Sequence, residues 1–404
     1  MKAVVFAAPI PTYVVTKLAG AVSPSLFLGP HACTRLGDVP APALPSSRWV
    51  RVRTRLGGIC GSDLAIVTLA ASPSTSPFSS FPFVLGHENV GEVIDAGDGV
   101  TRVRPGQRVV ANPLLPCGPR GIDPPCAACA AGAYPRCEHF TDGALPPGMF
   151  IGTTRGLGGS WGEQFVAHED QLVPVPDSID DAAALLTEPF ACSVRAVRSD
   201  LPAAGTHALV IGAGSIGLLT LAALRALAPA TRVTVLARHA FQEEAARRLG
   251  ADQVVPARGD WLPALAEAGG ARLLNPILGP PIAVGGFDHT YVCIAGRRGV
   301  EDALRFTRAG GTVTLLGNVT ALPGVDWTPV WLKELVLRGS LTYGRHTHGG
   351  AAGDDFTEAL ALIAGGRAPV APLVTHTFPL GEIGRALSAA MGKESGSIKV
   401  ALRP

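Results

Sequence analysis

The chain has 404 residues, of which 47% are hydrophobic and 16% are charged. This composition is typical of a folded protein with a substantial core, and it predicts two or three domains. The formal net charge of +2 comes from interspersed residues, which argues against binding to nucleic acid or to a membrane. The first residues reach Pro9 and Pro11 before an apolar run long enough for a signal peptide has formed. We therefore expect a cytoplasmic protein, whose cysteines are metal ligands or buried thiols.

The chain up to about residue 180 contains short strand-like runs, such as residues 49–55 and 91–95. Gly, Pro and Asp turns separate these runs. This pattern predicts a β-rich first part of the molecule.

Two short segments of this first part carry side chains that bind metals. Residues 58–63 contain Cys60, and residues 85–91 contain His87 and Glu88. A thiolate, an imidazole and a carboxylate are the donors that zinc prefers. Cys60 and His87 are too far apart to share one helix, so they can bind a common ion only if the fold brings the two segments together.

From Ser193 onward the pattern changes to alternating strands and helices. We predict strands over residues 207–211, 232–236, 291–294 and 312–316, and helices over residues 216–227 and 242–249. This alternation is typical of an α/β fold with a doubly wound parallel sheet.

A glycine-rich turn connects the first of these strands to the first helix. It has the pattern Gly212-x-Gly214-x-x-Gly217, with Ser215 and Ile216 inside it. In this context the backbone amides at the start of the helix can hold a pyrophosphate. We therefore predict a dinucleotide site formed by these five residues.

The end of the second strand predicts which dinucleotide is bound. An acid normally stands there and accepts hydrogen bonds from the adenosine ribose. Here that position is Ala237, and Arg238 and His239 follow it. A cation that can bind a 2′-phosphate favours NADP over NAD. The alternative is an arginine that only stacks on the adenine, in which case NAD remains possible.

In several motifs the chain resembles the zinc-dependent medium-chain dehydrogenase/reductase superfamily, and in particular its sorbitol, threonine and glucose dehydrogenase-like branch. The motifs occur in order along nearly the whole chain: Gly86-His87-Glu88, the turn at residues 104–109, Glu188-Pro189-Phe190, the glycine turn at residues 212–217, and Gly396-Ser397-Ile398-Lys399-Val400.

This resemblance implies two domains. The first is a β-rich GroES-like catalytic domain over residues 1–192, completed by residues 341–404. The second is a Rossmann dinucleotide-binding domain over residues 193–340. The resemblance also implies a homodimer or homotetramer, and the apolar strand at residues 312–316, near the sheet edge, is compatible with such an assembly.

The resemblance further implies a catalytic zinc bound by Cys60 and His87, with Glu88 and Glu188 as the remaining donors. One of the two glutamates would act through water. Cys192 lies four residues after Glu188 and would face the same side of a helix, so it is an alternative ligand. We prefer the carboxylate, because a single cysteine is more often a small buried apolar residue.

Two residues near the thiolate are implied to support this zinc. Asp63 would bind the far nitrogen of His87 and fix its tautomer. Ser62 would face the zinc-bound oxygen, although a hydroxyl in a turn can instead cap a backbone amide.

A second, structural zinc is implied by Cys126, Cys129 and Cys137. The family's first ligand would stand three residues before Cys126, where this chain has Asp123. We predict that Cys117 is the fourth ligand, across an insertion of six residues. Asp123 as an oxygen ligand is one alternative, and a disulfide or an empty lobe is another.

Taken together, these features predict a zinc-dependent oxidoreductase that transfers hydride between a secondary alcohol or polyol, or the matching carbonyl, and NADP(H). Its catalytic residues would be Cys60, Ser62, Asp63, His87 and Glu88. One alternative is a zinc-independent double-bond reductase of the same superfamily. Another is a nucleotide-binding protein without turnover.

Overall fold

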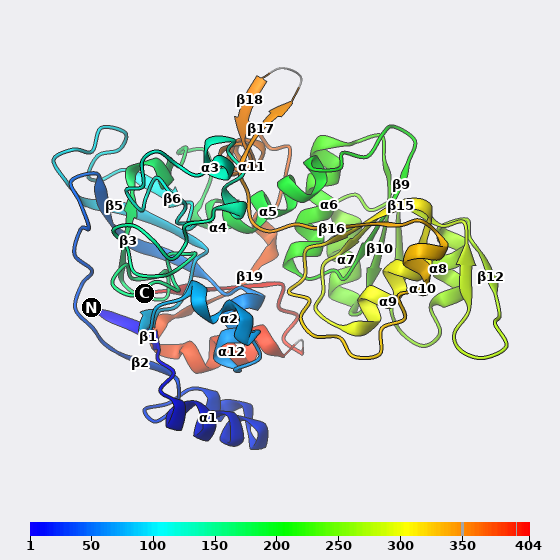
Figure 1. Ribbon diagram of the computed structural model, residues 1–404, viewed down its shortest axis with the longest axis horizontal. Coiled ribbons are helices and arrows are strands. Elements are labelled where there is room, and N and C mark those ends of the chain that lie inside the picture. The colour runs from blue at the N-terminus through cyan, green and yellow to red at the C-terminus, as the bar shows by residue number, and fades with distance from the viewer. Residues whose placement is uncertain (349–350, 393) are drawn as a thin grey trace. The chain divides into compact units, whose positions relative to one another are not determined.

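The computed structural model describes residues 1–348, 351–392 and 394–404. The chain forms two compact units (Figure 1). Unit 1 comprises Met1–Glu188, Gly344–Leu360 and Val374–Pro404, and unit 2 comprises Pro189–Tyr343 and Ala361–Leu373. The C-terminal part of the chain therefore completes unit 1. Within the described ranges, every helix is too short or too polar to cross a lipid bilayer.

Unit 1 is built mainly from β-strands, as the sequence pattern predicts. Its strands are β1 (Lys2–Phe6), β2 (Thr34–Asp38), β3 (Trp49–Gly58), β4 (Phe83–Val84), β5 (Asn89–Ala96), β6 (Arg108–Ala111), β7 (Gln164–His168), β8 (Leu172–Pro174), β17 (Arg345–His348), β18 (Ala351–Asp354), β19 (Val374–Pro379) and β20 (Lys399–Arg403). The large sheet has the order β19-β20-β3-β5-β6-β8, with β7 also paired to β3. A smaller sheet has the order β2-β1-β4, and β17 and β18 form a separate hairpin (Figure 1).

Short helices connect these strands. They are α1 (Ile10–Val22), η1 (Pro24–Phe27), α2 (Gly61–Val67), η2 (Pro73–Phe78), α3 (Ala127–Ala130), η3 (Tyr134–Arg136), η4 (Glu169–Gln171), α4 (Asp181–Leu185), η6 (Leu380–Glu382) and α12 (Ile383–Met391), while α5 (Thr187–Arg198) and α11 (Asp355–Ala364) run from one unit into the other. Helix α1 lies between strands β1 and β2. It exposes several apolar side chains, among them Ile10, Leu18 and Val22.

Unit 2 confirms the predicted doubly wound sheet. Its strands are β9 (His207–Ile211), β10 (Arg232–Ala237), β11 (Gln253–Pro256), β14 (Phe287–Val292), β15 (Thr307–Leu315) and β16 (Val336–Gly339), and a small antiparallel pair is formed by β12 (Arg272–Leu274) and β13 (Ile282–Val284). The main sheet has the order β11-β10-β9-β14-β15-β16, and its neighbouring strands are parallel. The helices of this unit are α6 (Ser215–Leu227), α7 (Ala240–Arg248), α8 (Leu262–Ala268), α9 (Arg297–Phe306), α10 (Thr328–Leu332) and η5 (Ala371–Leu373).

Two strands of unit 2 begin earlier than predicted. Strand β14 starts at Phe287 and β15 at Thr307, whereas apolar runs alone predict starts at 291 and 312. The added residues include Asp288 and Arg308, whose side chains form an ion pair at 2.6 Å. Polar residues at the start of these strands are therefore accommodated by a cross-strand pair, which hydrophobic periodicity does not reveal.

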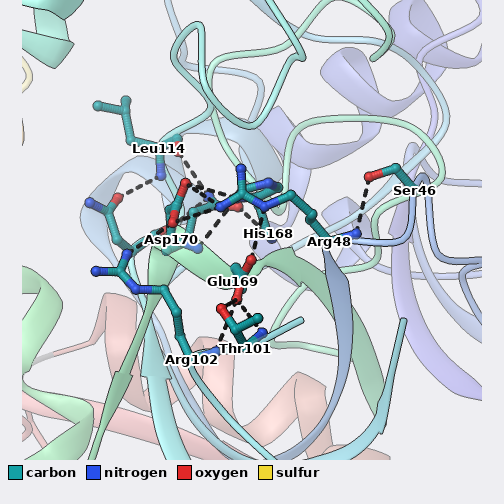
Figure 2. Close-up of polar contacts among 10 residues, drawn as sticks. Ser46, Arg48, Thr101, Arg102, Leu114, His168, Glu169 and Asp170 are labelled. Atoms are coloured by element: carbon teal, nitrogen blue, oxygen red, sulfur yellow. Dashed lines mark hydrogen bonds and ion pairs between the residues drawn. The ribbon is translucent and has the colours of Figure 1, made fainter. Parts of the chain in front are cut away.

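A buried carboxylate, Glu169, joins three separate loops of unit 1 (Figure 2). Arg48 Nε donates to one oxygen at 2.9 Å, and the backbone N–H groups of Thr101 and Arg102 donate to the other at 2.7 and 3.0 Å. Burial opposes ionisation of Glu169, but these donors outweigh it and lower the pKa to about 2. The ionised carboxylate therefore stabilises the fold at neutral pH.

We expect Glu169→Gln to lower the free energy of unfolding by about 2 kcal/mol at pH 7, because hydrogen bonds to a charged acceptor are lost. The usual pKa of this carboxyl is near 4.5 and its folded value is about 2. The stabilisation should therefore be complete above pH 4.5 and decline as the pH falls toward 2. Urea unfolding, followed through the fluorescence of the buried Trp49 and Trp161, measures the difference at each pH.

Asp170→Asn is the matched control. Asp170 also pairs with Arg48, but its side chain is 41% exposed, so its loss should cost less than about 1 kcal/mol. An equal effect of the two variants, or an effect of Glu169→Gln that persists unchanged at pH 2, would contradict this account.

Candidate functional site

Trp161 holds together the two segments that carry the predicted metal donors. Its indole Nε1 donates to Gly58 O at 2.8 Å, and its backbone N–H donates to Leu85 O at 2.9 Å. The side chain is fully buried in the core of unit 1. One aromatic residue thus connects the end of β3, just before Cys60, to the loop just before His87. The sequence does not reveal this role of Trp161, because nothing local indicates its partners.

Cys60, His87 and Glu88 come together in the folded chain. Each offers a ligand atom, and these atoms lie within 4.8 Å of one another. Asp63 lies behind the imidazole, with Oδ1 at 3.2 Å from His87 Nδ1, and its other oxygen accepts from the Cys60 N–H at 2.9 Å. The contact with Nδ1 leaves Nε2 as the nitrogen that can bind a metal. This donor set fits Zn²⁺.

The electrostatics of this group favour a cation. Burial disfavours an imidazolium at His87, but the carboxylate of Asp63 and the thiol of Cys60 raise its pKa well above the usual value. The negative potential that favours a proton on the ring also favours a bound metal ion.

Lys399, from the C-terminal strand β20, makes a buried ion pair with Glu88. Its Nζ lies 2.6 and 2.7 Å from the two carboxylate oxygens and 3.3 Å from Ile59 O. Lys399 is 2% exposed and Glu88 is fully buried. Burial opposes the charge on Lys399, but Glu88 outweighs it and raises the pKa of the lysine. The sequence places Lys399 in a recognised motif without revealing this partner.

The remaining predicted residues of this site lie on two helices. Ser62 is the second residue of α2 and is half-buried. Glu188 is buried at the second position of α5, and its charge also raises the pKa of Lys399. Cys192 is on the same helix α5, four residues further along, so the two side chains lie on the same side of the helix.

The four cysteines Cys117, Cys126, Cys129 and Cys137 also gather into one group, with sulfur atoms within 4.8 Å of one another. The Cys126 N–H donates to Cys117 Sγ at 3.4 Å, and the His139 N–H donates to Cys137 Sγ at 3.4 Å. A hydrogen bond from the backbone of Glu138 lowers the pKa of Cys126 to about 6. Four thiols with such bonds suit a structural zinc. Asp123, the alternative ligand, is exposed.

A fully buried arginine organises the lobe that carries these cysteines. Its guanidinium donates to five backbone carbonyls, those of Leu115, Asp142, Leu145, Pro146 and Gly148. This residue, Arg120, lies in the insertion that follows Cys117. Burial lowers its pKa, and the thiols of Cys137 and Cys117 act in the opposite direction. Burial raises the pKa of Cys129 and Cys137, so these thiols would lose their protons on binding zinc, and the cation of Arg120 would then offset part of the charge of Cys137 and Cys117. The sequence alone does not indicate this role of Arg120.

The predicted nucleotide turn has the backbone that such a ligand requires. Gly212 has φ +96°, and a Cβ on Gly217 would collide with the carbonyl of Gly212. A Cβ on Gly214, at the N-cap of α6, would instead meet open space. Ser215 and Ile216 begin that helix. The turn therefore leaves open space at the helix N-terminus, the feature by which βαβ nucleotide sites hold a pyrophosphate.

At the end of β10 the structure places a basic group. Ala237 is buried at the end of the strand, Arg238 is exposed, and His239 is the N-cap of α7. Arg258 comes from the end of the neighbouring strand β11, and its Nη1 donates to Arg238 O at 3.2 Å. The sequence does not reveal Arg258 as part of this group, because its relation to Arg238 depends on the pairing of the two strands.

Known families match both units of the chain. Residues 46–177 match the family described as alcohol dehydrogenase GroES-like domain, and residues 215–365 match the family described as zinc-binding dehydrogenase. An L-threonine 3-dehydrogenase from Rhizobium johnstonii is 30% identical over 89% of this chain and 93% of the relative. Sorbitol dehydrogenase 2 from Saccharomyces cerevisiae is 28% identical over 87% of this chain and 91% of the relative.

Solved structures are similar as well. A zinc-binding dehydrogenase from Sinorhizobium meliloti 1021, bound to NADP, superposes with a TM-score of 0.70 at 25% identity, over 92% of this chain and 95% of that one. The two family matches, and relatives that cover most of the chain, indicate the same superfamily as the sequence motifs. The chain belongs to the zinc-dependent medium-chain dehydrogenase/reductase superfamily.

Proposed function

We propose that the protein is a zinc-dependent oxidoreductase that transfers hydride between a secondary alcohol or polyol, or the matching carbonyl compound, and NADP(H). The observation that carries this proposal is the gathering of Cys60, His87 and Glu88 around one point, in a chain that also has an open nucleotide turn. The relatives that act on L-threonine and sorbitol support a secondary alcohol as substrate. The donor group counts against a zinc-independent double-bond reductase.

In this proposal Cys60 and His87 bind the catalytic zinc directly. Glu88 and Glu188 provide carboxylate near it. Because both oxygens of Glu88 accept from Lys399, Glu188 is in this proposal the direct ligand, and Glu88 acts through water. The four-cysteine group, with Cys117 as its fourth member, binds the structural zinc.

The residues around the catalytic zinc have separate roles. Zinc bound there supplies a Lewis acid for the alcohol or carbonyl oxygen. Asp63 holds His87 in the tautomer that binds metal. Ser62, two residues after Cys60, accepts the hydroxyl proton and passes it to water.

The preferred cofactor in this proposal is NADP(H). Ala237 provides no carboxylate for the ribose, and Arg238 adds a positive charge beside it. The structure from Sinorhizobium meliloti contains NADP, which supports this choice. NAD(H) remains the alternative if Arg238 only stacks on the adenine.

We also propose that the protein is a cytoplasmic homodimer or homotetramer. Within the described ranges, none of the eight cysteines takes part in a disulfide bond, which is compatible with a reducing compartment. The predicted strand at residues 312–316 belongs to β15, and the edge of the sheet is its neighbour β16. Val336 and Leu337 of β16 are 48% and 36% exposed. An exposed apolar edge strand can pair with the same strand of a second copy.

Steady-state assays test the proposed activity. We expect NADPH consumption or formation with members of a panel of secondary alcohols, polyols, ketones and aldehydes. Cys60→Ser should lower turnover about a thousandfold, since a Lewis acid contributes several kcal/mol, while the thermal unfolding curve stays the same. Cys192→Ser should keep turnover if Glu188 is the ligand. Full activity in Cys60→Ser, or none with the whole panel, would refute the proposal.

Metal analysis tests the structural site. The wild-type protein should contain two zinc ions per chain, and Cys117→Ser should contain one and unfold at a lower temperature, because a closed zinc site contributes to folding. Asp123→Asn is the control and should retain both ions. Loss of zinc in Asp123→Asn but not in Cys117→Ser would show that the oxygen ligand is the correct one.

Fluorescence titrations with NADPH and NADH test cofactor preference. Arg238→Ala should weaken NADPH binding about tenfold to a hundredfold, the value of a charged hydrogen bond, and leave NADH binding nearly unchanged. Arg232→Ala removes a charge at the other end of the same strand and should change neither. Equal weakening of both cofactors by Arg238→Ala would favour adenine stacking over phosphate binding.

Sedimentation tests the assembly. The wild-type protein should sediment as a dimer or tetramer at micromolar concentration, and Leu337→Lys should shift it toward smaller species, because a charge on an edge strand opposes pairing. A wild-type protein that is only monomeric would rule out the assembly.

A further inference from the structure

Two arginines 20 residues apart in the chain, Arg238 and Arg258, meet where β10 and β11 end. The strands are parallel, with Ala237 opposite Pro256. Their carboxyl ends therefore lie at the same edge of the sheet, where nucleotides bind in such folds. Arg258 follows β11 by two residues and donates from Nη1 to Arg238 O at 3.2 Å.

The position of Arg258 is defined by a buried acid. Its Nη1 lies 2.6 Å from Oε1 of Glu243, whose side chain is 8% exposed. Arg247 pairs with the other oxygen of Glu243 at 3.4 Å. Glu243 stands in the first turn of α7, so its carboxylate would repel a phosphate bound at the end of β10. Arg258 and Arg247, which both pair with Glu243, offset that charge.

Arg258 can still reach a ligand. Its side chain is 52% exposed, and both of its contacts use Nη1. The other two donors of its guanidinium, Nε and Nη2, take part in neither of these contacts. A guanidinium can bind a phosphate through two parallel N–H groups.

We propose that Arg258 is a second specificity-determining residue, which binds the 2′-phosphate of NADP(H) together with Arg238. This inference rests on the proposed preference for NADP. Glu243 is the residue that positions it: the carboxylate holds the guanidinium over the end of β10. Arg258 pairs with the carboxylate oxygen of Glu243 that Arg247 does not contact, so with Arg238 it gives the end of β10 a net positive charge.

Calorimetric titration of the zinc-loaded, full-length protein with 2′,5′-ADP and with 5′-AMP tests the inference without turnover. The two probes differ in the 2′-phosphate. The wild-type protein should bind 2′,5′-ADP more tightly. Arg258→Ala should weaken binding of 2′,5′-ADP about tenfold and change binding of 5′-AMP less than about twofold. Arg248→Ala is the matched control, because it removes a charge from α7 that pairs with Glu244 and not with Glu243.

The double variant Arg238→Ala/Arg258→Ala adds an independent measurement. If both guanidiniums bind the same phosphate, their effects on 2′,5′-ADP should not be additive. A wild-type protein that prefers 2′,5′-ADP, with unchanged binding in Arg258→Ala, would overturn the role of Arg258 and leave the NADP preference intact. Equal loss for both probes in Arg258→Ala would also overturn it. A wild-type protein that does not distinguish the probes would instead refute the proposed NADP preference.

Discussion

The buried ion pair between Glu88 and Lys399 is the interaction on which the metal-binding unit depends. Removing two charges from water costs several kcal/mol each, and only close contacts offset that cost. Here both carboxylate oxygens lie within 2.7 Å of the ammonium group. Losing either partner would leave an uncompensated buried charge. The last strand of the chain, β20, is therefore part of the site, although it follows the metal-binding loops by about three hundred residues.

The surrounding contacts orient the metal donors independently of the metal. Trp161 connects the two donor segments through Gly58 and Leu85, and Asp63 holds His87 through Nδ1. Each contact restricts a side chain or loop that would otherwise have to be ordered when an ion binds. A rigid set of donors loses less conformational entropy on binding, which favours affinity and a defined geometry.

Charges serve different purposes in the two units. In unit 1 the charged groups Glu88, Lys399 and Arg120 are buried and fully engaged with the protein, so they determine structure. At the β10 edge of unit 2, Arg238 and Arg258 are exposed, so they remain accessible to a ligand. Unit 2 also has a buried charge with a structural role: Glu243 holds the exposed Arg258 in place.

The sequence by itself determined the fold class, the family and the candidate donors. Glycines such as Gly212 and Gly217 are required by local backbone geometry, and the alternation of strands and helices follows from local periodicity. The partners of Trp161, Arg120, Lys399 and Arg258 were decided only by the tertiary structure. These residues are ordinary in their local sequence, and their partners lie between 5 and 311 positions away. No local pattern encodes such contacts, because they arise when strand pairing and burial bring distant polar groups into a place where water cannot satisfy them.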